Sequence, residues 1–401
     1  MTFKTSYPLV ELRDIVAETQ YGTSELANGS DGAFPILRMN NITYEGVFVL
    51  GDLKRIDLKE SDIGKHTVRR GDLLFNRTNS PELVGKTAVW DSDETFAFAG
   101  YLIRVRFDES KACPKYVSAF LNSIYGKRML FAAAKPSINM SNISATGLLR
   151  LKVPLPPLSV QKRISAILDQ ADAIRRKRRV AGEATAALIP AAFYEVFGDP
   201  GANPKGWPVI EMGEVVSESQ YGTSSLLELD QRAFPVLRMN NITYFGEWDL
   251  SDLKWLDFTD EETPKYTVRK GDLLFNRTNS PELVGKTAVW PCEEAYGFAG
   301  YLIRIRFDER RALPDFVSAY LNSTFGKSLL FKSATPSNNM SNLSASTFRR
   351  LPLTLPALPL QKKFTEYCTH VRASVGHHQC ATGESESLFR TLAHRAFRGG
   401  L

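Results

Sequence analysis

The sequence predicts an α/β (α+β) protein built from two similar domains and two long helices, and three observations support this fold class. First, residue i matches residue i+200 without a gap over most of the 401-residue chain, so the chain is a direct repeat. Second, each copy of the repeat alternates short β-rich runs with clusters of Gly, Pro, Asn and Ser. Third, each copy is followed by a segment whose apolar residues recur at helical spacing.

The extent of the repeat sets the domain boundaries. Residues 21–160 and 221–360 are identical at 84 of 140 positions, and the segments that follow them share only 6 of 40 residues. A period this long is a whole domain rather than a solenoid repeat. We therefore expect a first domain at 1–157, a helix at 158–197, a second domain at 198–357 and a C-terminal helix at 358–401.

Within each domain the predicted elements are short. Runs such as AFPILRM, TVRRGDLLF, KTAVW and GYLIRVRF predict strands, because β-branched and aromatic residues are bounded there by turn residues. Residues 114–134 have helical periodicity and begin with a proline, which suits the first turn of a helix. We expect a curved sheet with a few helices in each domain.

The two long helical segments each carry one apolar stripe, and a long helix of this kind needs a partner to cover the stripe. Each segment is the obvious partner of the other, which also explains why they diverged, since facing helices must be complementary rather than identical. The residues expected to pair the helices are Ile164, Ile167, Leu168 and Ile174 in the first helix and Phe364, Val371, Leu388 and Leu392 in the second.

Composition narrows the class of protein. The chain is 43% hydrophobic and 23% charged, which is typical of globular proteins, and its net charge of +6 with a pI near 9.0 fits a polyanionic partner. We expect no apolar stretch long enough to span a membrane and no signal peptide, hence a cytoplasmic protein. Four cysteines without CxxC spacing argue against a disulfide framework or a metal site.

Motifs for catalysis are incomplete. The GKT at 85–87 lacks the glycine that a phosphate-binding loop needs five residues earlier, since Ser80 stands there. NSPE at 79–82 differs from the Asn/Asp-Pro-Pro-aromatic tetrapeptide of amino-methyltransferases, and the five histidines have no partners in the repeat. The sequence therefore predicts no catalytic residue in this chain.

The repeat does retain polar side chains suited to base edges and phosphates. Arginine can bond guanine through two donors, asparagine can do the same to adenine, and Ser, Thr, Tyr and Lys serve phosphates. The same residue types also make turns and helix caps, which is the alternative for any one of them. The candidate DNA-binding residues are Gln20, Tyr21, Thr23, Arg38, Asn40, Asn41, Thr43, Tyr44, Arg77, Thr78, Asn79, Lys86, Asn139, Ser141 and Asn142, with their repeats Gln220, Tyr221, Thr223, Arg238, Asn240, Asn241, Thr243, Tyr244, Arg277, Thr278, Asn279, Lys286, Asn339, Ser341 and Asn342.

The densest charge is the basic run RRKRR at 175–179, which has no copy at 375–379. Charge runs of this kind are commonly a solvated helix face, and a contact to a partner subunit or to DNA between half-sites stays open.

The whole arrangement resembles the specificity subunit of type I restriction-modification systems. Each domain ends in an approach of the form N-I-S-x-x-x-L-x-x-L-x-x-P-L-P-P-L-x-x-Q-x-x-I before its long helix, and GDLLFNRT in both halves is similar to a strand common in such domains. In the first copy the approach is Asn142, Ile143, Ser144, Leu148, Leu151, Pro154 to Leu158, Gln161 and Ile164. The second copy departs from it at Thr354, Ala357 and Phe364.

This resemblance implies a function. The two domains would be target-recognition domains, and the long helices an antiparallel coiled coil that relates them by a pseudo-two-fold axis and sets the spacer of a bipartite DNA site. Two modification subunits would bind S-adenosylmethionine and methylate adenine, and ATP-driven restriction subunits, with ATP and Mg²⁺, could join them. No cofactor is expected in this chain.

Two rival functions stay open. A nuclease would need acidic residues shared by both halves, and Asp72, Glu82, Asp108 and Glu109 do recur, although turn chemistry accounts for them. A stand-alone two-domain DNA-binding protein or adaptor is the other alternative. In either DNA-binding case, two domains this alike predict similar half-sites, and a two-fold protein reads an inverted repeat, so we expect an interrupted palindrome.

Overall fold

The computed structural model describes residues 3–25, 29, 31–80, 83–137, 140–225, 234–337 and 340–401. The chain forms two compact units, and the first is discontinuous in sequence. It consists of Met1–Arg178 and Cys380–Leu401, and the second unit consists of Arg179–Gln379. Each unit therefore contains one domain and part of both long helices.

The first unit is built from short strands and helices, and the helix predicted at 114–134 is divided into two. Its strands are β1 (Leu9–Glu11), β2 (Val16–Tyr21), β3 (Phe34–Leu37), β4 (Lys54–Ile56), β5 (Thr67–Val68), β6 (Leu73–Asn76), β7 (Thr78–Asn79), β8 (Thr87–Val89), β9 (Phe96–Phe98), β10 (Leu102–Phe107), β11 (Lys135–Ser137), β12 (Met140–Asn142) and β13 (Lys152–Pro154). Its helices are α1 (Glu60–His66), α2 (Pro114–Asn122), α3 (Ile124–Ala133), α4 (Ala145–Leu149) and the start of α5 (Leu158–Ala186), with 3₁₀ turns η1 (Leu12–Asp14) and η2 (Met39–Asn41).

The second unit repeats these elements. Its strands are β14 (Val209–Glu211), β15 (Val216–Tyr221), β16 (Phe234–Leu237), β17 (Lys254–Leu256), β18 (Thr267–Val268), β19 (Leu273–Asn276), β20 (Thr278–Asn279), β21 (Thr287–Val289), β22 (Tyr296–Phe298), β23 (Leu302–Phe307), β24 (Thr335–Ser337), β25 (Met340–Asn342) and β26 (Pro352–Thr354). Its helices are α6 (Leu188–Phe197), α7 (Thr263–Tyr266), α8 (Pro314–Asn322), α9 (Thr324–Ser333), α10 (Ala345–Arg349) and the start of α11 (Leu358–Arg398), with 3₁₀ turns η3 (Met212–Glu214) and η4 (Met239–Asn241).

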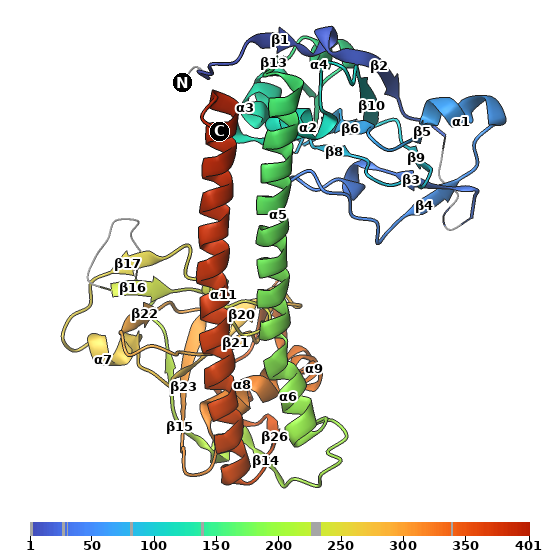
Figure 1. The fold of residues 1–401 in the computed structure, drawn as a ribbon. Helices are drawn as coiled ribbons and strands as arrows, with labels where there is room; N and C mark the ends of the chain where they lie inside the picture. Colours follow the sequence, from blue (N-terminus) through green and yellow to red (C-terminus); the bar gives the residue numbers. More distant parts are fainter. Residues whose placement is uncertain are drawn as a thin grey trace. The chain divides into compact units, whose positions relative to one another are not determined.

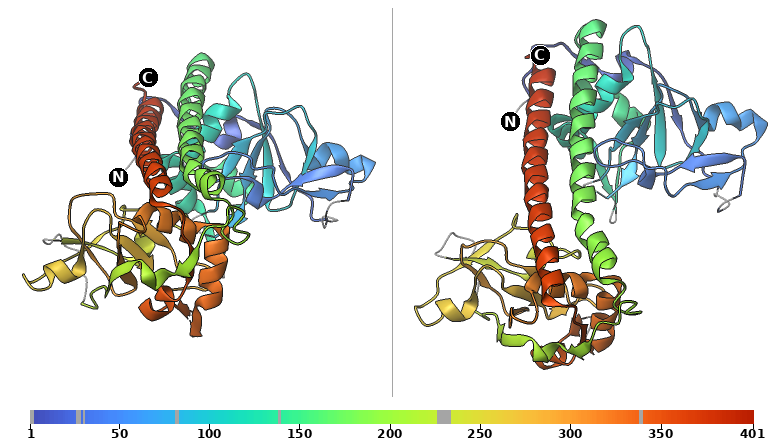
Figure 2. Two further views of the ribbon diagram at one scale, coloured as in Figure 1. Left: turned by 90° about the horizontal axis from the view of Figure 1, so that it is seen from below. Right: turned by 60° about the horizontal axis from the view of Figure 1, so that its bottom comes forward.

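Two four-stranded sheets form the body of each domain. In the first domain an antiparallel sheet has the strand order β2-β10-β6-β8, and a mixed sheet has the order β4-β3-β9-β5. A small sheet, β11-β12-β7, and the pair β1-β13 complete it. Figures 1 and 2 agree in placing α1 and β4 at the side of this domain that faces away from α5. The mixed α/β class predicted from the sequence is confirmed.

The alternation of side chains along β6 separates two hydrophobic cores in the first unit. Leu73 and Phe75 face a core that also receives α2, α3, the start of α5 and the end of α11. Leu74 points the other way, into a core between the two sheets. The second unit has the same pair of cores.

The long helices are antiparallel within each unit. In the first unit Ile164 of α5 shares a core with Phe397 of α11, while Arg175, further along α5, contacts Glu386, which lies earlier in α11. Figure 1 shows these two segments side by side. In the second unit the ring of Phe197, the last residue of α6, packs edge-on against that of Phe364, near the start of α11, at a centroid distance of 5.2 Å, so the end of one helical stretch again meets the start of the other. The prediction of two long antiparallel helices is confirmed.

Not every residue expected in the helix pairing lies there. Ile164, Leu168, Phe364 and Val371 are buried, and Ile167 and Leu392 are partly buried. Ile174 and Leu388 are instead 52% and 57% exposed, so their assignment to the pairing is wrong. The apolar spacing is correct over two turns, but the stripe drifts around a long straight helix and no longer faces the partner at these positions.

The basic run is divided between the helix interface and solvent. Arg178 donates to the carbonyl oxygen of Ala381 and to the hydroxyl of Ser385, which is buried. Arg175 pairs with Asp172 and Glu386 and lies over the ring of Phe389 at 4.7 Å. The run is therefore in part an interface feature rather than only a solvated face.

One helical stretch in the described chain, Leu158–Phe197, is long and apolar enough to cross a membrane by length and composition alone. The expectation that no stretch reaches this length was too strict. Core helices pass the same test, and Phe193 and Phe197 from this stretch are buried in the second unit.

Candidate nucleic-acid interface

The loop after β6 carries the arginine of the repeated FNRTN motif, and the backbone fixes its position. The amide of Arg77 donates to the carbonyl oxygen of Tyr101 at 3.0 Å, and its own carbonyl accepts from the amide of Ile143 at 2.8 Å. β7, which follows directly, pairs with β12. Arg77 is thus held at the end of the antiparallel sheet where β2 ends and β10 begins.

The side chain of Arg77 lies over an aromatic ring. Its guanidinium carbon is 5.1 Å from the ring centroid of Tyr21, and one terminal nitrogen donates to the Oδ1 of Asn142 at 3.4 Å. Its Nε has no hydrogen-bond partner, and no carboxylate among the described residues pairs with it. We call Tyr21, Arg77, Tyr101 and Asn142 the Arg77 cluster.

The two tyrosines of this cluster differ in how they are held. The Tyr21 hydroxyl accepts from the amide of Ala145 at 2.9 Å, which fixes its ring, and the residue is 40% exposed. Tyr101 is 53% exposed. Tyr101 was not among the candidates predicted from the sequence, which were chosen from polar clusters. A tyrosine that follows a glycine in both copies, as Tyr101 and Tyr301 do, could have indicated an exposed ring at a turn.

The second unit repeats this arrangement. Arg277 lies 5.2 Å from the ring centroid of Tyr221, the Tyr221 hydroxyl accepts from Ala345, and Tyr301 is 52% exposed. The Nε of Arg277 is again without a partner, and a terminal nitrogen donates to the carbonyl oxygen of Gly300 at 3.4 Å. We call Tyr221, Arg277, Tyr301 and Asn342 the Arg277 cluster.

Around the Arg77 cluster, several candidates make local structure. Thr23 is buried and its hydroxyl accepts from the amide of Glu25, and the Gln20 amide donates to the backbone of Tyr21. Ser141 and Thr78 are also buried, while Asn79 is partly exposed. Their repeats Gln220, Thr223, Thr278, Asn279 and Ser341 have the same burial. Asn139 and Asn339 lie outside the described residues.

The second candidate group, around η2, is largely structural. Asn41 is buried, accepts from the Arg38 amide and donates to the carbonyl oxygen of Val49, so it caps the 3₁₀ turn and is not a base contact. Arg38 pairs with Asp52 at 3.1 Å, and the Thr43 hydroxyl accepts from the amide of Val47. The repeats Arg238, Asn241 and Thr243 do the same. The expectation that Asn41 and Asn241 meet DNA is therefore wrong.

Two residues of this group remain accessible. Asn40 is exposed, and Tyr44 is 44% exposed with the Lys127 ammonium 4.4 Å from its ring centroid. Their repeats are Asn240 and Tyr244, over which Lys327 lies at 4.8 Å.

Lys86 and Lys286 do not reach solvent. Lys86 is 7% exposed and its Nζ donates to the carbonyl oxygen of Met39 at 2.9 Å; Lys286 makes the same bond to Met239 at 2.7 Å. Burial lowers the pKa of both ammonium groups. Their prediction as phosphate contacts is wrong. Each ammonium group instead donates to a backbone carbonyl oxygen of a 3₁₀ turn, η2 in the first unit and η4 in the second.

A second lysine, Lys127, lies close enough to Lys86 for the two positive charges to repel each other. Lys127 was not among the candidates predicted from the sequence. Burial, together with the charge of Lys86, lowers its pKa to about 8, and burial does the same for Lys327. Only Glu45 opposes this shift, in the first unit.

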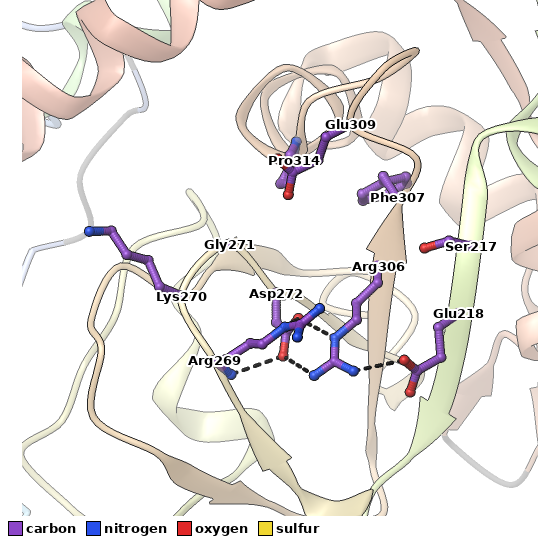
Figure 3. Close-up of a pocket in the computed structure, with 10 residues that line it drawn as sticks. All are labelled: Ser217, Glu218, Arg269, Lys270, Gly271, Asp272, Arg306, Phe307, Glu309 and Pro314. Atoms are coloured by element: carbon purple, nitrogen blue, oxygen red, sulfur yellow. Dashed lines mark hydrogen bonds and ion pairs between the residues drawn. The ribbon is translucent and has the colours of Figure 1, made fainter. Parts of the chain in front are cut away.

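The recurring carboxylates are engaged at the far end of the same sheet. In the second unit Arg306 bonds Asp272 at 2.7 Å and Glu218 at 2.7 Å, beside a cavity of about 250 Å³ (Figure 3). In the first unit burial opposes ionisation of Glu18, but hydrogen bonds from Arg104 and Arg106 hold its pKa below the ordinary value. Among the described residues, no group of three or more His, Cys, Asp or Glu side chains is arranged to hold a metal ion.

Known proteins resemble the chain in sequence. Residues 7–180 match the profile of the type I restriction modification DNA specificity domain. Over 218 residues the chain is 31% identical to a Methanocaldococcus jannaschii protein provisionally named as the type I restriction enzyme MjaX specificity subunit, and this match spans about half of each, 51%. Over 398 residues it is 22% identical to the type I restriction enzyme EcoKI specificity subunit of Escherichia coli, covering 92% of this chain and 83% of the relative.

Solved structures share the fold. The type I restriction-modification S subunit from M. genitalium superposes with a TM-score of 0.62 at 13% identity, over 99% of this chain and 98% of that one. A chain from a study of complex assembly and conformational transition of the type I system gives a TM-score of 0.53 at 19% identity over the full length of both. Residues 7–180 therefore contain the type I restriction modification DNA specificity domain, the chain repeats this domain in its second unit, and over most of its length the chain is similar to type I restriction-modification specificity subunits.

Proposed function

We propose that this chain reads DNA sequence for a type I restriction-modification complex and has no catalytic role of its own. One observation carries the proposal. At the same end of the sheet in both units, an arginine with no carboxylate partner among the described residues lies over a tyrosine ring, and its amide donates to the backbone of a second, exposed tyrosine. Such groups are suited to base edges and to the DNA backbone.

The partners follow from the family. Two modification subunits, which would hold S-adenosylmethionine, are proposed to methylate adenine where this chain places them, and restriction subunits, with ATP and Mg²⁺, are proposed to join. The complex would act on DNA in the cytoplasm. The engagement of Asp72 with Arg106 at 2.8 Å favours this view over a nuclease, since it gives that recurring carboxylate a structural partner.

We further propose that the DNA site is bipartite and an interrupted palindrome. The residues of the Arg77 and Arg277 clusters are identical, so the two domains should read nearly the same bases. The pseudo-two-fold relation expected from the sequence would present them in inverted order. Residues 45–62 differ most from 245–262 and could change one base preference.

Methylome sequencing tests this proposal. A host that carries the complete system is compared with the same host lacking the gene for this chain. We expect methylated adenines in a motif with two similar, inverted halves, present only in the first host. Two unrelated half-sites would contradict the palindrome, and the absence of any new motif would contradict the function.

The nuclease alternative has its own test. The purified chain, incubated with Mg²⁺ and plasmid DNA, should leave the DNA intact. Cleavage that is lost in an Asp72→Asn variant would overturn the proposal.

A further inference from the structure

Among the described residues Arg77 has no anionic partner, unlike Arg38 and Arg106 of the same domain. Arg38 pairs with Asp52, and Arg106 pairs with Glu18 and Asp72. Arg77 makes one long side-chain hydrogen bond, to Asn142 at 3.4 Å, and Arg277 makes one, to Gly300 at 3.4 Å. A partly buried cation costs free energy, so a position that leaves it without a carboxylate in both units is suited to a ligand.

The guanidinium is also placed over the same tyrosine ring in both units before any ligand arrives. Its backbone is fixed by Tyr101 and Ile143, and the ring beneath it is fixed through the Tyr21 hydroxyl. A planar cation stacked on a ring loses little freedom when it binds, so its terminal nitrogens form a rigid pair of donors. Rigid paired donors select an acceptor pair of matching spacing.

DNA offers two such acceptors, a phosphate group and the O6 and N7 edge of guanine in the major groove. The surroundings favour the base. The neighbours are neutral: Asn142 accepts from Arg77 and donates to the hydroxyl of Thr78, and Tyr101 is 53% exposed. Lys86, the nearest lysine in sequence, is turned inward to Met39 and adds no charge to the surface. Arginine can pair with a phosphate as well as with guanine, but the four residues of the cluster supply only one cation among neutral side chains.

We infer that Arg77 and Arg277 each bind the O6 and N7 of one guanine, one in each half of the DNA site. This inference rests on the proposed function, and it names the base pair that each cluster reads. Because the two clusters consist of the same residue types at repeated positions, the two guanines occupy equivalent positions of the half-sites.

The test uses the complete complex with its modification subunits and duplexes that carry the methylome motif. Each guanine of the motif is replaced in turn by 7-deazaguanine, which lacks the N7 acceptor. We expect one guanine in each half whose replacement weakens binding. In the Arg77→Ala complex, replacing one of these guanines should cause no further loss, because the altered domain can bind that half of the palindrome, while replacing both should weaken binding further.

Substitutions separate base reading from phosphate binding. Arg77→Ala should weaken binding to the cognate duplex by about 5- to 150-fold and relax selection at one base pair only. Arg77→Lys keeps the charge but not the paired donors, so it should lose the selection as well. The control is Arg70→Ala, because Arg70 lies at the other end of β6 and pairs with Asp91 and Asp93; it should bind normally.

The outcomes are distinguishable. A motif without a G·C pair in either half, or an Arg77→Lys complex that keeps full selectivity, would overturn the inference while leaving sequence-specific binding intact. A parent complex with no sequence-specific binding would instead contradict the proposed function. Thermal unfolding of Arg77→Ala, compared with the parent, shows whether a loss of binding is a loss of fold.

Discussion

The ammonium group of Lys86 donates to the backbone carbonyl oxygen of Met39 across 47 positions of sequence, at 2.9 Å, and Lys286 repeats the bond to Met239. The bond ties the η2 turn to the segment that follows the FNRTN loop. A buried carbonyl that loses its donor keeps the full cost of its desolvation. Lys86 therefore holds the η2 turn against the segment that pairs, through its backbone, with Asn76, the residue before Arg77.

Replacing Lys86 should affect stability rather than the charge seen by DNA. We expect Lys86→Met to lower the free energy of unfolding of the first unit by about 1–3 kcal/mol, because the carbonyl oxygen of Met39 is left without a partner. Chemical denaturation measures this loss. The salt dependence of DNA binding should not change, and a slope lower by about one unit would restore Lys86 as a phosphate contact.

The helix interface offers a matched pair of substitutions on α5. Leu168 is 3% exposed in the core of the first unit, whereas Ile174 is 52% exposed. Leu168→Ala should cost about 2–5 kcal/mol of unfolding free energy, and Ile174→Ala about 0.5 kcal/mol or less. Equal losses in denaturant melts would place Ile174 in the interface after all.

The end of α11 closes the core of the first unit, and the equivalent α6 closes that of the second. Phe397 lies 5.2 Å from Phe120, and Phe197 lies 4.9 Å from Phe316, between ring centroids. Phe397→Ala should cost about 3–5 kcal/mol and expose amides of the first unit to hydrogen exchange, while Phe197→Ala should do so in the second. Loss of protection in both units from either change would show that they unfold as one.

Lys127 predicts a pH dependence of stability. Its pKa is about 8 in the folded protein and near 10.5 when unfolded, so between these values the unfolded state binds more protons. By linkage, its penalty on stability is fully present below pH 8 and is lost as the pH rises toward 10.5. Lys86 and Glu45 face the same group.

The measurement compares the parent with Lys127→Met from pH 7 to 10.5. The stability of the parent relative to the variant should rise across this range, and Lys327→Met should give the same difference in the second unit. A constant difference would mean that Lys127 titrates normally.

The sequence by itself determined the repeat, the α/β class, the two long helices and the family, because these follow from local periodicity and from residues that recur at a fixed offset. It also brought Tyr21, Arg77 and Asn142 into the candidate set, although not into contact. Identity between the two copies indicates that a residue is needed, but it does not distinguish a role in DNA binding from a role in folding.

Only the tertiary structure decided which needed residues face solvent. Lys86 and Asn41 are the same in both copies because they satisfy the buried backbone around η2, and Tyr101 is the same as an exposed ring. In the sequence, however, all three look alike, as polar or aromatic residues beside turns. The distinction depends on which carbonyl oxygen or ring lies within about 3–5 Å after folding: the carbonyl that Lys86 reaches is 47 positions away, and even Asn41, which bonds Val49 only 8 positions away, needs the folded turn to be buried. The same holds for Ile174 and Leu388, since the face that a long helix buries is set by the surface packed against it.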